Sequence, residues 1–374
     1  MARSRRRTTT PRQGKVRYAV LGLGHIAQRA VLPAFAHASR NSELAALVSD
    51  DDVKLRKLGR RYAVDARYHY AQLDECLASG IDAVYIALPN HLHREYTERA
   101  ARAGVSVLCE KPMALTERDC QAMIGAARRG GVKRMVAYRL HFEAANLSAL
   151  EAVKAGTIGE PRIFNAVFTM QVQDGNVRLR RAAGGGTLWD IGIYCINAAR
   201  YLFRAEPEEV FAYTANNGEK RFREVEEMTS AVLRFPNQRL ASFTCSFGAA
   251  DAGAYQVVGT KGDVRVDPAY EYAEGLKSVL TVDGGKRARA YPKRDQFAPE
   301  LLHFSDCVLT GRDPQPGGRE GLADVRIIRA LYRAARTGRP VRLGPFAPPP
   351  RPTLAKEDRR PPVRKRELVH AKPA

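Results

Sequence analysis

The sequence lacks the patterns that mark membrane, disulfide-rich or metal-binding proteins. No apolar run reaches the roughly 18 residues that a membrane-spanning helix needs. The six cysteines contain no C-x-x-C pair, which favours reduced thiols and predicts a cytoplasmic protein. The eight histidines form no H-x-x-x-H motif and no mixed cluster with cysteine, so we expect no metal site.

Acidic residues are scarce at both ends of the chain, which accounts for much of the net charge of +21. Residues 1–14 hold five arginines and no acid, and no apolar segment of an export signal follows them. Residues 345–374 are rich in proline and hold eight basic and three acidic residues. We expect two disordered tails that pack no core. Because much of the positive charge is confined to them, we predict no specific nucleic-acid partner.

A dinucleotide-binding motif follows the first predicted strand, Val16–Leu23. The segment Gly22–Ala27 has the form G-x-G-x-x-A and opens a predicted helix. Its first glycine permits a tight turn, its second lets the backbone approach a pyrophosphate, and its alanine lets the helix pack on the strand. A second strand, Leu44–Val48, follows at the expected distance. A glycine turn without a ligand is the alternative.

The residues after the second strand indicate the cofactor. A lone acid there would bind the ribose of NAD and repel the 2′-phosphate of NADP. Here Ser49 can hydrogen-bond a phosphate, and Lys54 with a cation at position 56 or 57 can neutralise it. The three aspartates at 50–52 argue for NAD, although Asp52 can cap the helix expected one residue later. We therefore favour NADP over NAD.

Lys111 follows a predicted buried strand, Val105–Cys109, within the sequence Glu-Lys-Pro. In an open parallel sheet, the carboxyl ends of the strands border the ligand crevice. We therefore expect Lys111 where a nicotinamide ring and a substrate meet, with Glu110 as an ion-pair partner. The alternative is a solvated lysine beside a proline turn.

Three glycines, Gly184–Gly186, precede an apolar segment that carries Asp190 and Tyr194. Consecutive glycines allow the backbone to lie closely against a ligand. A spacing of four residues puts both polar side chains on one face of a helix. The structural alternative is a glycine loop before an amphipathic helix with a half-buried tyrosine.

These motifs, in this order, resemble the glucose–fructose oxidoreductase/inositol dehydrogenase (GFO/IDH/MocA) family over residues 15–345. Leu88-Pro89-Asn90 with His93, and Tyr138-Arg139, also carry the resemblance. It implies an α/β protein with an N-terminal Rossmann domain (15–136) and a C-terminal α/β domain (137–344) with a large, mostly antiparallel open sheet. Homodimers or homotetramers would form through that sheet. The strands expected in it are 162–172, 210–214, 229–235, 239–245, 255–259 and 263–266, and the helix of about 321–336 would pack back on the first domain.

The resemblance also implies the site residues. The catalytic residues would be Lys111, Asp190 and Tyr194. The cofactor-binding residues would be Gly22, Leu23, Gly24, His25, Ile26, Ser49, Lys54, Tyr70, Leu88, Pro89, Asn90, His93, Glu110, Lys111 and Arg139.

Most members of the family have a histidine where this chain has Tyr194. With tyrosine at this position, the chain resembles the branch of the family that acts on aldoses, which includes NADP-dependent xylose dehydrogenases. We therefore expect hydride transfer between NADP and C1 of an aldose, with Tyr194 as the acid/base. A phenol with an ordinary pKa near 10 is a poor base at neutral pH unless a cation lies beside it, and Lys111 is the candidate cation. Asp190 would hold a second hydroxyl or orient the pair.

Two alternatives remain open. One is a transhydrogenase that retains NADP while it oxidises one sugar and reduces another. The other is a catalytically silent protein that senses NADP or a sugar. The sequence does not identify the sugar, and the candidates for selecting it are Gln171, Gln173, Arg178, Tyr270 and Tyr272.

Overall fold

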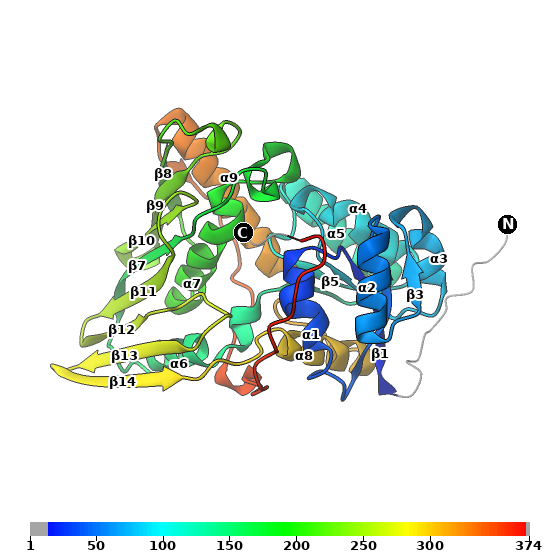
Figure 1. Ribbon diagram of the computed structural model, residues 1–374. Helices are drawn as coiled ribbons and strands as arrows, with labels where there is room; N and C mark the ends of the chain where they lie inside the picture. The colour runs from blue at the N-terminus through cyan, green and yellow to red at the C-terminus, as the bar shows by residue number, and fades with distance from the viewer. Residues whose placement is uncertain (1–13, 372–374) are drawn as a thin grey trace.

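The computed structural model describes residues 14–371, so residues 1–13 of the predicted basic tail lie outside it. The chain builds two sheets, one in each half of the molecule, with helices packed between and around them (Figure 1). No helix within the described range is long and apolar enough to cross a membrane.

The first domain is built on a six-stranded parallel sheet of order β3-β2-β1-β4-β5-β6. This is the doubly wound order of dinucleotide-binding domains, and helices pack on both faces. The predicted Rossmann fold is therefore confirmed. The strands are β1 (Val16–Leu21), β2 (Ser42–Val48), β3 (Ala66–Tyr68), β4 (Ala83–Ile86), β5 (Ser106–Glu110) and β6 (Arg134–Ala137). The helices are η2 (Ala27–Val31, a π-helical turn), α1 (Leu32–Ala34), α2 (Asp52–Tyr62), α3 (Leu73–Ala78), α4 (His93–Arg102) and α5 (Glu117–Gly130).

Helix α2 begins one residue before the predicted position. The carboxylate of Asp51 accepts a hydrogen bond from the backbone N–H of Lys54 at 3.0 Å, so Asp51 is the N-cap. The predicted cap, Asp52, is wrong because Asp52 already has a helical backbone. Asp51 has the extended backbone that lets a short acidic side chain reach back to the third helical amide.

The second domain is built on a nine-stranded sheet of order β14-β13-β12-β11-β7-β10-β9-β8-β15. Only the β7–β10 pair is parallel, so the predicted mostly antiparallel sheet is confirmed. The six predicted strands are present, and β13, β14 and β15 were not predicted. The strands are β7 (Pro161–Thr169), β8 (Glu209–Ala215), β9 (Met228–Phe235), β10 (Arg239–Ser246), β11 (Ala252–Gly259), β12 (Gly262–Val266), β13 (Leu276–Val282), β14 (Gly285–Tyr291) and β15 (Val341–Arg342).

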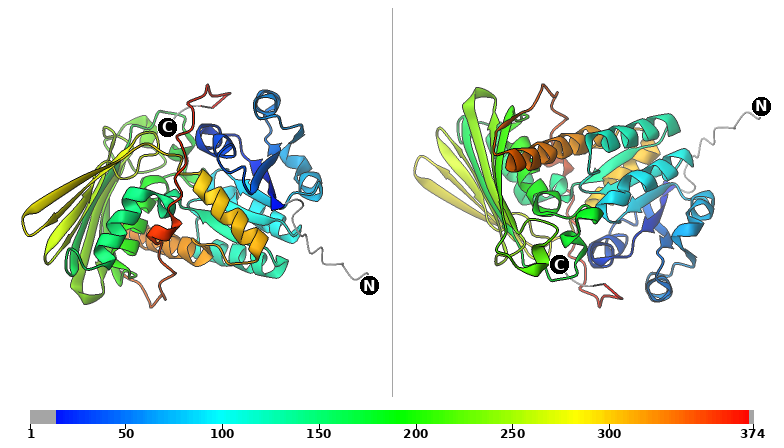
Figure 2. Two further views of the ribbon diagram at one scale, coloured as in Figure 1. Left: turned by 90° about the horizontal axis from the view of Figure 1, so that it is seen from below. Right: turned by 90° about the horizontal axis from the view of Figure 1, so that it is seen from above.

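Helices cover the face of this large sheet that is turned toward the first domain, and the opposite face carries no helix (Figure 2). The helices of the second half of the chain are α6 (Ala144–Lys154), α7 (Ile193–Phe203), α8 (Ala298–Thr310) and α9 (Gly318–Thr337). α8 packs on β1 and β2 of the first domain, whereas α9 contacts α5 and β6 of the first domain and β8 of the second. The predicted packing of this last helix on the first domain is therefore confirmed.

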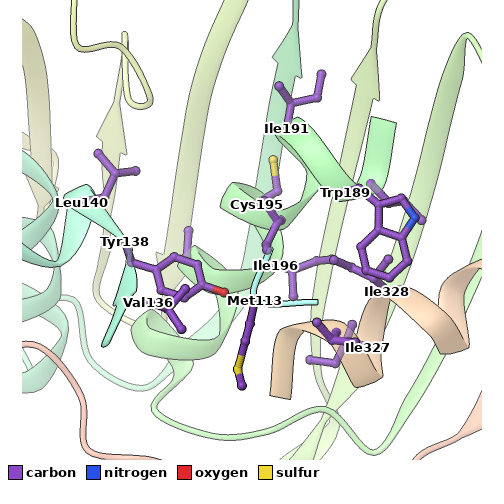
Figure 3. Packing of buried hydrophobic residues seen from close by; sticks show 14 of the residues in the cluster. Met113, Val136, Tyr138, Leu140, Trp189, Ile191, Cys195, Ile196, Ile327 and Ile328 are labelled. Carbon is purple, nitrogen blue, oxygen red and sulfur yellow. The ribbon is translucent and has the colours of Figure 1, made fainter. Parts of the chain in front are cut away.

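The two domains share a hydrophobic core. Met113 and Val136 from the first domain pack in one cluster with Trp189 and with isoleucines of α9, all buried (Figure 3). Protein cores are close-packed and deform little. The shared core therefore fixes the distance between Lys111, two residues before Met113, and Asp190, which follows Trp189.

The C-terminal segment differs from the disordered tail that we expected at residues 345–374. Over residues 345–371 it runs in an extended path across both domains and returns to the first (dark red in Figure 1). Val369 is buried in the core of the first domain. A proline-rich segment can be ordered without forming a helix or a strand when side chains of the folded domains hydrogen-bond to its backbone. Composition alone does not reveal such partners.

Candidate active site

The candidate catalytic residues meet at the carboxyl edge of the first sheet. β5 ends at Glu110 and delivers Lys111, which precedes Pro112 through a cis peptide bond. A π-helical turn of the second domain, η8 (Leu188–Gly192), carries Asp190 and leads into α7, which carries Tyr194. The predicted clustering of Lys111, Asp190 and Tyr194 is what the structure shows.

Asp190 is the electrostatic centre of the cluster. Lys111 Nζ lies 3.3 Å from one carboxylate oxygen of Asp190 and donates to its backbone carbonyl at 2.7 Å. Arg178 Nε donates to the other carboxylate oxygen at 2.5 Å. Burial alone would raise the pKa of Asp190, but Arg178 and Lys111 outweigh it and lower the pKa to about 2. Asp190 is therefore a carboxylate at every working pH, and Arg178, a candidate for selecting the sugar, anchors it.

Lys111 carries its charge in a dry environment. Burial alone would lower the pKa of Lys111, but Tyr194, Asp190 and Glu110 raise it above its ordinary value. The predicted side-chain ion pair with Glu110 does not form. Instead, Glu110 accepts hydrogen bonds from the Tyr85 hydroxyl at 2.8 Å and from the backbone N–H of Lys111 at 3.3 Å. Glu110 thus positions the backbone, while Asp190 holds the ammonium group.

Two cations lie over the ring of Tyr194. Lys111 Nζ is 4.8 Å from the centre of its ring, and the guanidinium carbon of Arg139 is 5.0 Å from the same centre. Arg139 Nε also donates to the Tyr194 hydroxyl at 3.3 Å. Lys111 was the only cation that we expected here. In the structure Lys111 faces the ring, and Arg139 bonds the oxygen.

Arg139 was predicted to bind the cofactor, and its polar atoms have other partners. Its guanidinium group donates to the side chain of Gln296 and to the carbonyl of Tyr270, and it lies 5.3 Å from the ring centre of Tyr272. The residue is 5% exposed. These bonds fix the guanidinium group against Tyr194. Gln296 was missed because no sequence pattern connects it to Arg139.

The three glycines before the cluster pack against protein atoms rather than facing an open site, so the ligand approach that we expected there is wrong. A Cβ atom on Gly184 would lie 2.8 Å from the side chains of Asn90 and Leu115. On Gly185 it would lie 2.2 Å from the Arg178 carbonyl, and on Gly186 2.4 Å from the Tyr332 hydroxyl. The glycines thus allow the loop that carries Arg178 to fold tightly onto the helix that carries Asp190.

The dinucleotide motif has the geometry of a nucleotide cradle. Gly22 has φ +92°, and a Cβ atom there would lie 2.5 Å from the Ala87 carbonyl, so only glycine fits. A Cβ atom on Gly24 would meet no other atom within 4 Å, so the backbone at this position borders open space. His25 and Ile26 begin the helix that follows, whose free N–H groups favour an anion. Leu23 is buried and offers only its backbone. These residues fit the pyrophosphate of a dinucleotide.

His93 has a structural role. The predicted cofactor contact is wrong, because its side chain is fully buried. Its two ring nitrogens lie 2.8 Å from the Pro112 carbonyl and 2.9 Å from the Leu88 carbonyl. It therefore ties the Leu88–Asn90 turn to the turn that carries Lys111. Asn90 donates to the Gly184 carbonyl at 2.8 Å and ties the same turn to the glycine loop.

The predicted adenosine end of the site lies after β2. Ser49 is 5% exposed, and its hydroxyl accepts a hydrogen bond from the Asp51 backbone N–H at 3.2 Å. Lys54 Nζ is 3.9 Å from the Asp51 carboxylate. Tyr70 packs edge-on against Tyr96 with ring centres 5.8 Å apart. A serine and a lysine are thus in place, as the NADP prediction requires, and Asp51 beside them is one of the acids that argue for NAD. Within residues 14–371 no group of three or more His, Cys, Asp or Glu side chains could hold a metal ion.

The fold and the site define a two-domain oxidoreductase with a nicotinamide-dinucleotide domain. Residues 16–138 match the oxidoreductase family with an NAD-binding Rossmann fold, and residues 147–265 match the GFO/IDH/MocA C-terminal domain. The chain belongs to the GFO/IDH/MocA family of oxidoreductases. The predicted family and enzyme class are confirmed.

The match to several similar proteins extends over nearly the whole length of each of them. A D-xylose 1-dehydrogenase [NADP(+)] from Haloarcula marismortui is 32% identical over 89% of this chain and 95% of its own. An aldose–aldose oxidoreductase from Caulobacter crescentus, solved with glycerol, is 43% identical over 88% of this chain and 100% of its own, with a TM-score of 0.84. A 3-ketoreductase from Actinomadura kijaniata, solved with NADP and TDP-benzene, is 28% identical over 86% of this chain and 98% of its own, with a TM-score of 0.79.

Proposed function

We propose that this protein is an NADP-dependent sugar oxidoreductase that transfers a hydride between the nicotinamide and C1 of an aldose, giving a lactone in the oxidative direction. The observation that carries the proposal is the buried cluster of Lys111, Asp190 and Tyr194 at the carboxyl edge of the dinucleotide-binding sheet. The named activities of the dehydrogenase from Haloarcula and the oxidoreductase from Caulobacter support the substrate class.

Each residue of the cluster has a distinct task in the proposed reaction. NADP, which the turn at Gly22 and Gly24 would hold, would supply the acceptor for the hydride that leaves C1 of the sugar. Tyr194 takes the proton of the C1 hydroxyl, so that the carbon–oxygen bond becomes a carbonyl. Arg139, which donates to the Tyr194 hydroxyl, and Lys111, which lies over the Tyr194 ring, supply positive charge beside the oxygen that exchanges the proton. Asp190 keeps Lys111 charged and oriented.

A screen of aldoses and polyols with both nucleotides tests this proposal most directly. We expect nicotinamide reduction with at least one aldose and NADP, and lactone as the product. If no sugar reduces either nucleotide while both bind, the catalytically silent sensor becomes the better hypothesis.

The cofactor is NADP, as predicted. The NADP-dependent relatives agree with the residues after β2, where Lys54 and Ser49 flank Asp51. Replacing Lys54 by alanine removes a cation from the phosphate end of the site. We expect the affinity for NADP to fall on the order of tenfold, because a charged hydrogen bond contributes about 1.5–3 kcal/mol. The affinity for NAD, measured in the same variant by fluorescence titration, should change little. An equal loss for both nucleotides would contradict the role of Lys54.

A second candidate function is the sugar–sugar transhydrogenase, in which NADP stays bound through both half-reactions. The 43% identity to an aldose–aldose oxidoreductase favours it. An absorbance spectrum of the purified protein, recorded before any nucleotide is added, separates the two. A bound nicotinamide indicates the transhydrogenase, and a nucleotide-free protein indicates the dehydrogenase.

We also propose that the protein forms homo-oligomers through the open face of the large sheet, in the cytoplasm. Ile163, Val232 and Leu240 are each between 44% and 48% exposed on neighbouring strands of this face. Replacing Leu240 by glutamate should reduce the mass in light scattering toward that of the 41.4 kDa monomer. A variant of unchanged mass would argue against this face as the interface.

A further inference from the structure

The C-terminal segment connects the second domain to the nucleotide-binding loop. After β15 it passes α9, where Arg319 donates to the Ala347 carbonyl at 3.1 Å, and the guanidinium of Arg351 then donates to the Glu206 carboxylate at 2.7 Å in the second domain. Lys356 then donates to the Gln315 carbonyl at 2.8 Å. Residues 366–370, which we call the C-terminal strap, contact η2 and α2, and the C-terminal segment passes in front of α1 (Figure 1).

The strap is anchored by a buried amide. The Gln28 side chain donates to the Val369 carbonyl at 2.8 Å and accepts from the Val369 N–H at 2.7 Å. The same amide donates to the carbonyl of Leu23, inside the dinucleotide motif, at 2.8 Å. Gln28 is 3% and Val369 6% exposed. Leaving a buried polar group without its hydrogen-bond partner costs about 1–3 kcal/mol. The paired hydrogen bonds between Gln28 and Val369 therefore hold the strap on the first domain.

Further contacts fix the path of the strap between the first helix and α2. Arg29 in η2 donates to the Arg366 carbonyl at 2.9 Å, and Arg61 near the end of α2 donates to the Glu367 carbonyl at 2.8 Å. The guanidinium carbon of Arg366 lies 5.7 Å from the ring centre of Tyr62. The chain therefore runs from the C-terminal end of α2 toward its N-terminal end, where the phosphate site lies.

The strap ends at the residues that we assign to the 2′-phosphate. His370 Nδ1 lies 3.0 Å from the carboxylate of Asp51, the N-cap of α2. That carboxylate stands next to Lys54, and its negative charge would repel a phosphate. His370 therefore gives Asp51 a partner and brings a further hydrogen-bonding group to the phosphate end of the site.

We propose that the C-terminal strap forms one wall of the adenosine end of the nucleotide site, slows the release of NADP, and through His370 favours the phosphorylated nucleotide over NAD. The proposal rests on the proposed cofactor. It makes the last described residues of the chain part of the binding site, although they lie about 320 residues away from Asp51 in sequence. It also connects nucleotide retention to the second domain, because the same segment is bound there through Arg351.

The rate of NADPH release tests the proposal without any sugar. The full chain is loaded with NADPH, an excess of NADP is added, and the loss of NADPH fluorescence is followed by stopped flow. Val369→Asp places a charge in the core contact and should speed release at least about tenfold, since affinity differences within one site arise mostly in the dissociation rate. His370→Ala, at an exposed side chain, should speed NADPH release about threefold or more and leave NADH release unchanged.

Lys365→Gln is the matched control, because its exposed side chain precedes the strap and its replacement leaves the contacts of residues 366–370 in place. We expect its release rate to equal that of the unchanged chain. The proposal is overturned if His370→Ala and Val369→Asp release NADPH at the original rate, or if they bind it more tightly, which would mean that the strap blocks the site. If the variants release NADPH faster as expected but the unchanged protein oxidises no sugar, the proposed function is refuted and this inference stands.

Discussion

Replacing Tyr194 by phenylalanine should reduce the turnover number with the best aldose by at least about 100-fold, because an acid/base group typically contributes about 10²–10⁴ to the rate. Phenylalanine keeps the ring that Lys111 and Arg139 face but removes the oxygen to which Arg139 donates. The affinity for NADP, measured by fluorescence titration, should remain within a factor of about two, since the hydroxyl acts on the sugar.

Tyr213→Phe is the matched control for this experiment. Tyr213 is 69% exposed on β8, so the loss of its hydroxyl should leave turnover unchanged. A Tyr194→Phe enzyme with full activity would remove this residue from the mechanism. Lys111 would then be the remaining candidate for the proton transfer, since its ammonium group lies against both the Tyr194 ring and Asp190.

Replacing Arg200 by methionine should destabilise the protein by about 3–5 kcal/mol, because it removes the buried cation that three carboxylates share. Arg200 on α7 is fully buried and donates to Glu206 at 2.7 Å, and to Glu320 and Asp324 at 2.6 Å each. Asp324 also accepts a hydrogen bond from Tyr138, at the junction of the domains. Burial raises the pKa of Asp324 to about 6 even though Arg200 opposes it.

Thermal and urea unfolding, followed by circular dichroism, measure this effect. Arg329→Met is the control, since Arg329 is an exposed arginine on α9, the helix that carries Glu320 and Asp324. It should unfold at the same midpoint as the unchanged chain. If Arg200→Met also unfolds at the midpoint of the unchanged chain, the carboxylates are neutral in the folded protein and Arg200 is dispensable for stability.

Local signals in the sequence predicted much of the fold. The turn after β1 needs glycine at position 22 because the Ala87 carbonyl leaves no room for a side chain, and that need is visible as G-x-G-x-x-A. The hairpin of β13 and β14 had an equally local signal, which we missed. Asp283 and Gly284 form its turn with φ of 49° and 77°, and Asp-Gly between two strands is a strong hairpin signal.

The sequence by itself therefore determined most of the elements, the nucleotide cradle and the place of Lys111, since each depends on neighbours in the chain or on the edge of a parallel sheet. The resemblance to the family added Asp190 and Tyr194 to the cluster. Only the tertiary structure decided the partners of these groups. Arg139 reaches Tyr194, His93 supports two turns from within the core, and Val369 returns to Gln28. Such contacts join residues between 19 and 341 positions apart. They depend on how distant segments of the chain pack together, and no local pattern in the sequence records that.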